Sequence, residues 1–276
     1  MIDDPLPDDW RELQAGVQRI FRNVGMKADV EVDLQTPRGT INVDVLAIDT
    51  RSVDKIKYIV ECKNWSNSIP QSVVHSFTTV MHETGANIGF IVTKQGLQQG
   101  AIQYTKNTNI TGMTYLEFQE RYFEAWWKRY FCPRIGDAAD EPFQYVEPFN
   151  SQRDREYDRL TPEKQGCFDR LKKDTEIIAT FFTMFNIGIM PKLFKKSDIL
   201  IPQKNLDEFK SKLSTLLGFT VNTDCRTFRD LLEAIINYLL EVKGKFDAIF
   251  GGSIFEPKHS FSGVTFDGPP VDEDIY

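Results

Sequence analysis

Three ionisable residues in the N-terminal part of the chain have the types and the spacing that phosphodiester chemistry requires. Glu61 and Lys63 stand two residues apart in the apolar run 57–63, which has the composition of a β-strand. Because side chains alternate across a strand, these two residues point to the same face. Asp44 lies in a neighbouring strand-like run and can reach the same end of the sheet. We therefore expect two carboxylates and one ammonium at one rim of a β-sheet.

This set of groups fits the metal-dependent hydrolysis of a phosphodiester. Asp44 and Glu61 would hold Mg²⁺ or Mn²⁺, cations that prefer oxygen ligands, and the backbone carbonyl of Cys62 is a candidate third ligand. Lys63 would position or deprotonate the attacking water and offset the negative charge that develops on the phosphate. Glu12, on the predicted first helix, is a candidate for a further catalytic carboxylate.

Structural interpretations compete with the catalytic one at several positions. A Glu-x-Lys pair on a surface strand is often only a solvated ion pair. The presence of Asp44 and of the buried run 88–93 favours a catalytic site instead. Glu12 in a first helical turn can simply compensate the helix dipole. Gln71, at the start of the next helix, could touch phosphate or an active-site water, or be an exposed helix residue. Asp33 competes with Asp44, but its alternating neighbours predict a solvent-facing side chain.

Other chemistry-bearing residues favour structural roles. His75 and His82 fall a near-helical interval apart, but they lack a second cluster of ligands, so a metal pair is disfavoured. Trp126, Trp127 and Tyr130 could stack on nucleic-acid bases. Such an aromatic cluster more often belongs to a core or to a contact between domains.

The elements that must position the three ionisable groups follow from hydrophobic periodicity. Asp8 or Asp9 can cap a helix that ends at Gly25. Two alternating runs, 29–35 and 40–48, flank a Pro-Arg-Gly turn and indicate a β-hairpin. The predicted elements that follow are a strand at 57–63, a helix from Pro70 to about Glu83, a strand at 88–93, a helix at 97–106, a strand near 113–116 and a helix that contains Trp126 and Trp127. This order predicts an α/β fold with a mixed sheet and helices on its faces.

The composition and periodicity of the sequence change after residue 131. Prolines interrupt residues 132–160, and we interpret this segment as a linker or surface arm that follows a domain of residues 1–131. Helix signals return from Thr161, so residues 161–250 are predicted to form a mainly helical domain for recognition, assembly or partner docking. Residues 251–276 are rich in Pro, Gly and acidic residues, which is typical of a flexible tail.

Composition limits the class of protein. Apolar residues make up 41% and charged residues 26%, with a net charge of −7, which counts mildly against a protein that mainly coats nucleic acid. No run approaches the roughly 18 apolar residues of a membrane span, and the acidic N-terminus is unlike a signal peptide. The four cysteines are scattered without a C-x-x-C pair, which disfavours zinc and disulfides and favours a reducing cytoplasm.

The pattern of Glu12, Asp44 and Glu61-x-Lys63 resembles the PD-(D/E)XK nuclease superfamily and, more narrowly, the Mrr-type restriction endonuclease domain. The resemblance covers roughly residues 8–118, and the superfamily's Pro before the Asp is replaced by Val43. The stretches that carry it are VDVLA at 43–47, VECKNW at 60–65, GANIGFIVT at 85–93 and GLQQGA at 96–101. The resemblance implies a restriction-endonuclease-like fold, Mg²⁺-dependent DNA cleavage and a role in defence against foreign DNA.

Functions from different classes remain open at this point. The chain is either a DNA endonuclease or a non-catalytic nucleic-acid-binding or assembly subunit of a defence complex that keeps the nuclease fold. A nuclease that acts on RNA or branched DNA is a further alternative. The intact acidic and basic set favours catalysis, because a degenerated domain tends to lose such residues. Cutting both strands is simplest with two sites, so we expect a homodimer or larger complex, with the Phe-rich helical region as the interface to a second copy or a partner protein.

Overall fold

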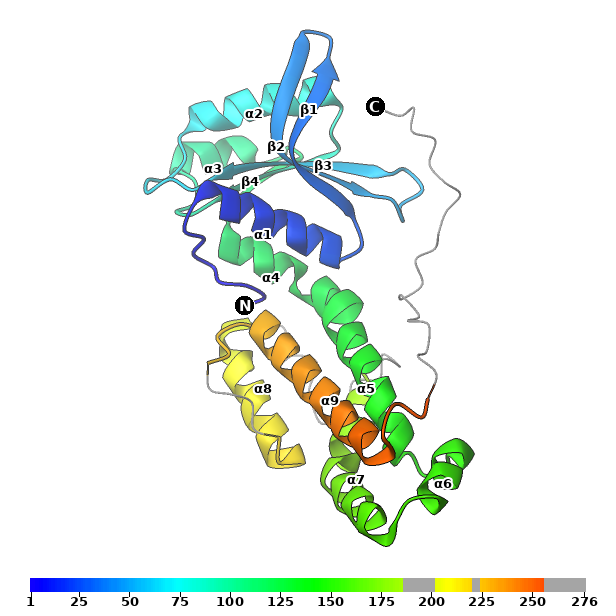
Figure 1. Cartoon of the computed structure of the whole chain (residues 1–276). Coiled ribbons are helices and arrows are strands. Elements are labelled where there is room, and N and C mark those ends of the chain that lie inside the picture. The colour runs from blue at the N-terminus through cyan, green and yellow to red at the C-terminus, as the bar shows by residue number, and fades with distance from the viewer. Residues whose placement is uncertain (186–201, 220–223, 256–276) are drawn as a thin grey trace. The chain divides into compact units, whose positions relative to one another are not determined.

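The computed structural model describes residues 1–185, 202–219 and 224–255 (Figure 1). These residues divide into two compact units, of which the first covers Met1–Arg129 and the second begins at Tyr130. The predicted tail at 251–276 falls mostly outside the described residues. Each unit is described by itself.

A five-stranded mixed sheet forms the centre of the N-terminal unit. Its strands follow the chain in the spatial order β1 (Lys27–Thr36), β2 (Gly39–Asp49), β3 (Ile56–Lys63), β4 (Ile88–Thr93) and β5 (Ile110–Thr114). The first three strands pair antiparallel, whereas β3, β4 and β5 pair parallel. Parallel neighbours need a crossover connection, and helices supply both crossovers here.

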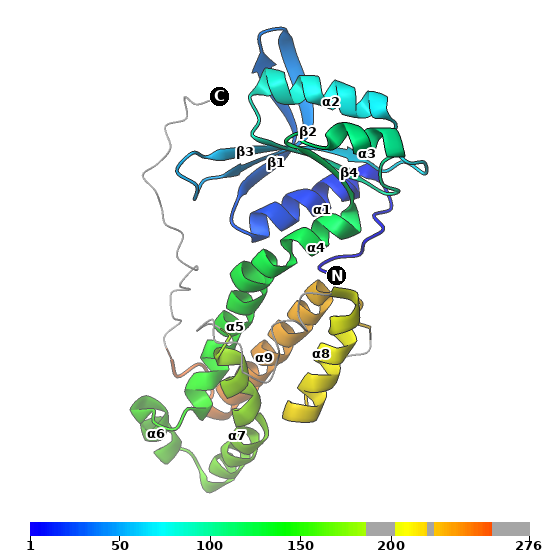
Figure 2. The same ribbon diagram turned by 180° about the vertical axis from the view of Figure 1, so that it is seen from behind.

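Four helices cover the two faces of this sheet. Helices α1 (Trp10–Asn23) and α4 (Tyr115–Trp126) lie on one face, and α2 (Gln71–Thr84) and α3 (Gln99–Thr105) lie on the other (Figures 1 and 2). The arrangement confirms the predicted fold class, a mixed sheet flanked by helices and followed by a mainly helical region. The elements occur in the predicted order, with ends that differ from the prediction by a few residues.

Apolar side chains fill the space between the sheet and the helices on both faces. Under α2, Phe77 and Met81 pack against the buried face of the sheet. A Cβ atom at Gly89 in β4 would lie 2.7 Å from side-chain atoms of both residues, so only glycine permits this close approach. On the opposite face, Phe21 of α1 meets Phe118 of α4 edge to face, with ring centroids 5.3 Å apart. Helices therefore pack on both faces of the sheet and hold the ends of its strands in fixed positions.

The second unit is built from helices. After a π-helical turn (Trp127–Phe131), the described helices are α5 (Cys132–Val146), α6 (Ser151–Asp158), α7 (Pro162–Thr183), α8 (Pro202–Leu217) and α9 (Phe228–Phe250). Helix α5 packs against both α7 and α9. In the core between them, Tyr145 stacks on Phe246 with ring centroids 4.8 Å apart, and its hydroxyl donates to Asp247 at 2.6 Å.

The expectation of a linker or arm over residues 132–160 is wrong, because α5 and α6 occupy most of it. Pro133 lies at the start of α5, where its missing N–H is not needed. Pro142 lies inside the helix, where a proline typically costs about 3 kcal/mol. Helix α5 persists because its buried face, which includes Ile135 and Ala139, packs on the neighbouring helices. Tertiary burial outweighs the local penalty, which composition alone does not reveal.

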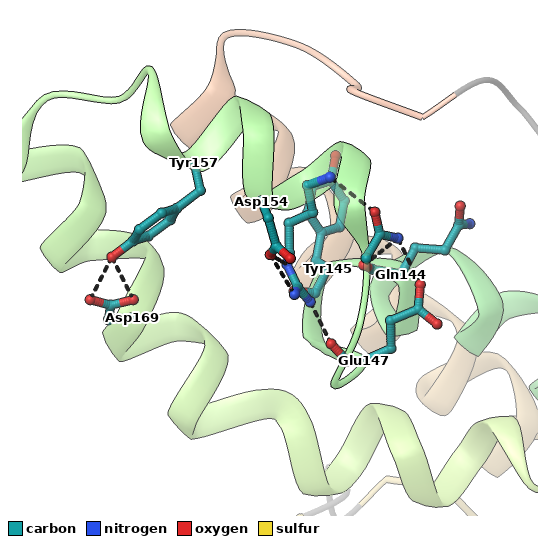
Figure 3. A network of polar contacts seen from close by, with 8 residues as sticks. Gln144, Tyr145, Glu147, Asp154, Tyr157 and Asp169 are labelled. Carbon is teal, nitrogen blue, oxygen red and sulfur yellow. Dashed lines mark hydrogen bonds and ion pairs between the residues drawn. The ribbon is translucent and has the colours of Figure 1, made fainter.

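The corner between α5 and α6 is held by a buried guanidinium. Arg153 is only 4% exposed and donates to the carbonyls of Tyr145 at 3.3 Å and Glu147 at 2.5 Å. It also forms an ion pair with Asp154 at 2.6 Å, in the network of Figure 3. These contacts satisfy carbonyls at the end of α5 that have no partner within the helix. The network therefore has a structural role.

Within the three described ranges, no helix combines the length and the apolar composition needed to cross a membrane.

Candidate active site

Strands β2 and β3 stop pairing at one end, and the candidate site lies where they separate. Their last pair at this end is Val45 with Val60. Beyond it, Oδ2 of Asp44 accepts a hydrogen bond from the backbone N–H of Cys62 at 2.6 Å. The side chain of Asp44 thus takes the place of a backbone partner in the ladder. This bond anchors a carboxylate to the strand that carries Glu61 and Lys63.

The second half of the site comes from the end of β3. Glu61 and Lys63 point to the same face of the strand, and the Lys63 ammonium forms an ion pair with Oε1 of Glu61. Both side chains are about one-quarter exposed. On its other side β3 pairs in parallel with β4, with Lys63 opposite Thr93. The backbone under both residues is therefore fixed by a continuous ladder.

The electrostatics of the site reflect its burial and its excess of negative charge. Burial raises the pKa of Asp44, and the nearby Glu61 and Glu31 carboxylates raise it further, against the lowering effects of the Cys62 N–H and of Lys63. Burial disfavours the charged form of Lys63. The hydrogen bond and charge of Glu61, together with the charge of Asp44, outweigh that effect and raise the pKa of Lys63. Lys63 is therefore an ammonium at neutral pH, whereas Asp44 carries its charge at a cost.

A solvent-open cavity of about 550 Å³ adjoins these residues. Asp44 and Lys63 line it, together with Gln14 of α1 and Glu31 of β1. Glu61 does not line the cavity, but its carboxylate forms an ion pair with Lys63, which does. All of these residues belong to the N-terminal unit, so the cavity is a feature of that unit alone.

Glu31 is a cavity residue that the sequence reasoning missed. It lies opposite Asp44 in the hairpin, between the pairs Val30 with Val45 and Val32 with Val43. Its φ of 53° lies in the left-handed region, which typically costs a residue with a side chain about 1–2 kcal/mol.

A buried amide holds the Glu31 side chain. Nε2 of Gln14, which is 4% exposed, donates to Oε1 of Glu31 at 2.6 Å. The alternating pattern around Glu31 predicts an ordinary strand residue and gives no sign of the unusual backbone. Counting residue pairs back from the turn at Pro37-Arg38 would have placed Glu31 beside Asp44.

Glu12 has a different position from the one expected of a metal ligand. Its Oε2 accepts the N–H of Asp8 at 2.8 Å, and its own N–H donates to Oδ1 of Asp9 at 2.9 Å. These two bonds close the first turn of α1 as a capping arrangement. Glu12 lines a separate cavity of about 320 Å³ with Asp3 and Arg19, and it does not line the cavity of Asp44.

The remaining candidates also lie outside the cavity. Gln71 is exposed at the start of α2, with its Nε2 atom 3.1 Å from Nε2 of His75. Asp33 is exposed, as its alternating neighbours predict, and accepts a bond from Nδ2 of Asn42 at 2.8 Å. The core interpretation of the paired tryptophans agrees with the burial of Trp126 and Trp127, which are 0% and 3% exposed.

The donor set at this end of the sheet suits a hard divalent cation. In the part of the chain that the structure describes, no three His, Cys, Asp or Glu side chains are grouped to hold a metal by themselves. Mg²⁺ does not need such a cage, because it uses one or two carboxylates and keeps several waters. Asp44, Glu61 and the Cys62 carbonyl provide oxygen donors. The pKa of Asp44 is raised by burial and then by the neighbouring carboxylates, and a bound cation would stabilise its charged form against both effects. The residues present therefore fit such an ion.

Comparison with known families agrees with this geometry. Residues 8–122 match the model of a restriction endonuclease family. This range contains α1, the whole sheet and all of the residues that line the cavity of Asp44. Residues 8–122 form an Mrr-type restriction endonuclease domain. The match supports a nuclease domain of the restriction endonuclease family in this part of the chain.

Two further comparisons add no functional argument. The chain is similar to the crystal structure of a protein of unknown function, AF1548, with 12% identity and a TM-score of 0.34, over 84% of this chain and 98% of that chain. At this identity and TM-score, the similarity says nothing about the function of the chain. No curated protein matches the chain.

Proposed function

We propose that this chain is a Mg²⁺-dependent endonuclease that hydrolyses DNA phosphodiester bonds in restriction or anti-phage defence. The observation that carries the proposal is the meeting of Asp44, Glu61 and Lys63 where β2 and β3 separate, inside the Mrr-type domain. A scaffold that only binds DNA has no need for this combination, because two half-buried carboxylates next to each other are costly.

Asp44, Glu61 and the Cys62 carbonyl would hold the cation, and Glu31 offers a further carboxylate in the same cavity. When bound, a divalent cation supplies Lewis-acid stabilisation of the charge that builds on the phosphate. The hydrogen bond from the Cys62 N–H keeps Asp44 oriented towards the end of β3. Gln14 restrains Glu31 in the same way. The protein thus pre-orients oxygen donors that would otherwise have to be ordered on binding.

Lys63 acts on the phosphate rather than on the cation. Against the lowering effect of burial, the carboxylates of Glu61 and Asp44 raise the pKa of Lys63, so in the free protein it is a hydrogen-bond donor and a positive charge. It lines the cavity and can therefore meet a phosphate oxygen or orient the attacking water. This contact strengthens as negative charge accumulates, which is the condition for lowering the barrier.

A cleavage assay on the full chain tests the proposal. Supercoiled, linear, methylated and single-stranded DNA, and RNA, are incubated with Mg²⁺, Mn²⁺ or EDTA. We expect cleavage of DNA with either cation and none with EDTA. Asp44→Asn should abolish cleavage, whereas the matched control Asp33→Asn, on the same hairpin but exposed and outside the cavity, should cut like wild type. DNA binding without cleavage under every condition would favour the non-catalytic subunit, and cleavage of RNA alone would replace DNA as the substrate.

The proposal includes assembly into a homodimer or larger complex. One site cuts one strand, and two sites related by symmetry cut both strands of a duplex. The helical unit is the proposed interface, because the nuclease domain already forms a closed fold of its own. The helical unit also exposes apolar side chains, including Ile177 of α7 at 63% and Leu240 of α9 at 51%. These residues are absent from the nuclease domain, so their substitution leaves its chemistry in place.

A further inference from the structure

The four tryptophans of the chain fall into two classes. Trp126 and Trp127 are buried, whereas Trp10 and Trp65 are 42% and 46% exposed. Both exposed rings line the cavity that holds Asp44 and Lys63. Tryptophan is the largest apolar side chain and normally contributes its surface to a core or an interface. Two exposed tryptophans that line one cavity therefore suit a ligand with flat apolar faces.

The two rings are carried by segments that are tied together. Trp10 is the first residue of α1, directly after the capping residue Asp9. Trp65 follows the end of β3 by two residues. Between them, Nδ2 of Asn64 donates to the carbonyl of Pro7 at 3.4 Å and to that of Asp8 at 3.3 Å. The start of α1 and the loop after β3 are thus held as one wall of the cavity.

A positive charge accompanies one of the rings. The guanidinium carbon of Arg11 lies 4.7 Å from the centroid of the Trp10 ring. Nucleic acid offers the complementary pair of features, flat bases and charged phosphates, at neighbouring positions along a strand. Stacking on aromatic rings combined with cationic contacts to phosphate is the usual way to bind single strands.

We infer that Trp10 and Trp65 are stacking platforms for unpaired bases, and that the substrate class of this nuclease is DNA that is single-stranded or locally unpaired beside the scissile phosphate. The inference rests on the proposed function, because it takes the phosphate beside Asp44 and Lys63 to be the one that is cleaved. Inside a duplex, both faces of each base are covered by its neighbours, so away from the duplex ends a protein ring can stack only on a base that has left the helix. Because the rings share a cavity with Asp44 and Lys63, the stacked base adjoins the phosphate that reacts.

A binding experiment tests the inference without using cleavage. The full chain is titrated into a fluorescein-labelled 15-nucleotide oligothymidylate, a blunt DNA duplex of the same length or a matching oligouridylate, in Ca²⁺, with anisotropy as the readout. Each probe is checked on a gel to be intact afterwards. We expect tighter binding of the single-stranded DNA than of the duplex. Trp10→Ala and Trp65→Ala should each weaken it by about 5- to 100-fold, and Phe at either position should restore part of the loss.

Tyr104→Ala is the matched control, because Tyr104 is an exposed aromatic residue of the same unit that does not line the cavity. It should bind like wild type. Near-ultraviolet circular dichroism, which reports on the buried Trp126 and Trp127, shows whether each variant is folded. Folded tryptophan variants that bind the single strand as wild type does would overturn the inference.

Three other results would also overturn it: equal losses on duplex and single strand, tighter binding of the oligouridylate, or an effect of the tryptophan variants on self-association alone. Failure of the proposed function looks different, since the wild type would then bind the oligothymidylate through Trp10 and Trp65 but cut no DNA with any cation.

Discussion

The Asp44 carboxylate and the Cys62 backbone N–H are joined by a 2.6 Å hydrogen bond at the point where β2 and β3 cease to pair. This bond replaces a rung of the ladder with a side chain and so connects the acidic group of one strand to the Glu61-x-Lys63 segment of the next. An amide oxygen can accept the same bond. Asparagine at position 44 is therefore a substitution that removes charge while it preserves geometry.

Asp44→Asn should make the protein more stable at neutral pH in EDTA. Burial and neighbouring carboxylates raise the pKa of Asp44 in the folded state, so the folded state binds this proton more tightly than the unfolded state. Stability is then lost as pH rises from the ordinary carboxyl pKa through the raised pKa. The variant lacks this loss. Urea denaturation from about pH 4 to about pH 8 should show the two stability curves diverging as pH rises. Parallel curves would contradict the assignment of a costly charge at Asp44.

Lys63→Ala should abolish cleavage while leaving cation binding intact or stronger. Loss of one proton-transfer or charge-stabilising group typically costs about 10² to 10⁴ in rate. The substitution also releases Glu61 from its ion pair, so that carboxylate becomes available to a cation. Lys63→Arg should not restore the full rate, because the guanidinium is bulkier and planar. Single-turnover cleavage and Mn²⁺ calorimetry measure the two effects separately.

The control for this substitution is Lys128→Ala, which breaks an exposed ion pair with Glu124 in the same unit. Surface pairs contribute little, so cleavage should not change. A Lys63→Ala protein that cuts within a few-fold of the wild-type rate would contradict a catalytic role. It would show that the Lys63–Glu61 pair contributes as little to cleavage as the Lys128–Glu124 pair.

The Glu31→Gly variant should be more stable than the Glu31→Ala variant. Glu31→Ala and Glu31→Gly both remove the carboxylate, but only glycine adopts a φ near 53° without a steric penalty, so it should be more stable by about 1 kcal/mol. At position 33, two residues along the strand, Asp33→Ala should be more stable than Asp33→Gly, since glycine in an ordinary strand costs about 0.5–1 kcal/mol relative to alanine. Urea denaturation of the four variants gives both differences. An alanine variant that is more stable than the glycine variant at position 31 would exclude a left-handed Glu31.

Charged substitutions in the helical unit should separate the copies. Ile177→Glu and Leu240→Glu place a carboxylate on exposed apolar positions of α7 and α9, and light scattering should then show monomers where wild type forms a dimer. The monomers should still nick supercoiled DNA but linearise it poorly. Val53→Glu is the control, since Val53 is 98% exposed in the N-terminal unit. A wild-type protein that is monomeric and still cuts both strands efficiently would count against this assembly.

The sequence predicted the part of the site that depends on periodicity. Strand alternation placed Glu61 and Lys63 on one face, and the hairpin carried Asp44 to the same end of the sheet. The hydrophobic pattern did not reveal Glu31, because a left-handed residue inside an alternating run leaves no mark on it, and only the register of the hairpin places Glu31 beside Asp44. The role of Glu12 stayed open in the sequence, because a first-turn carboxylate can cap a helix as readily as it can face a cavity, and only the direction of the side chain decides.

The helical unit was less predictable for a related reason. Its prolines indicate interruption when each is weighed alone, yet α5 contains one at its start and one in its interior. The deciding quantity is the apolar surface that α5 buries against α7 and α9, which are distant in sequence. Long-range burial of this kind is set by the assembled fold rather than by the local composition around each proline.

The break at Glu31 also divides the β1–β2 hairpin into two stretches with different freedom to evolve. Lys27–Val30 pairs with Val45–Ile48 inside the sheet, whereas the stretch from Val32 to the turn forms a ribbon that extends beyond the other strands (Figure 1). Adding or deleting one residue on each side of the ribbon's tip changes its length without changing the pairs below the break. The length of this ribbon, and with it the reach of its tip, can therefore change while the Glu31 carboxylate at its base keeps its place opposite Asp44.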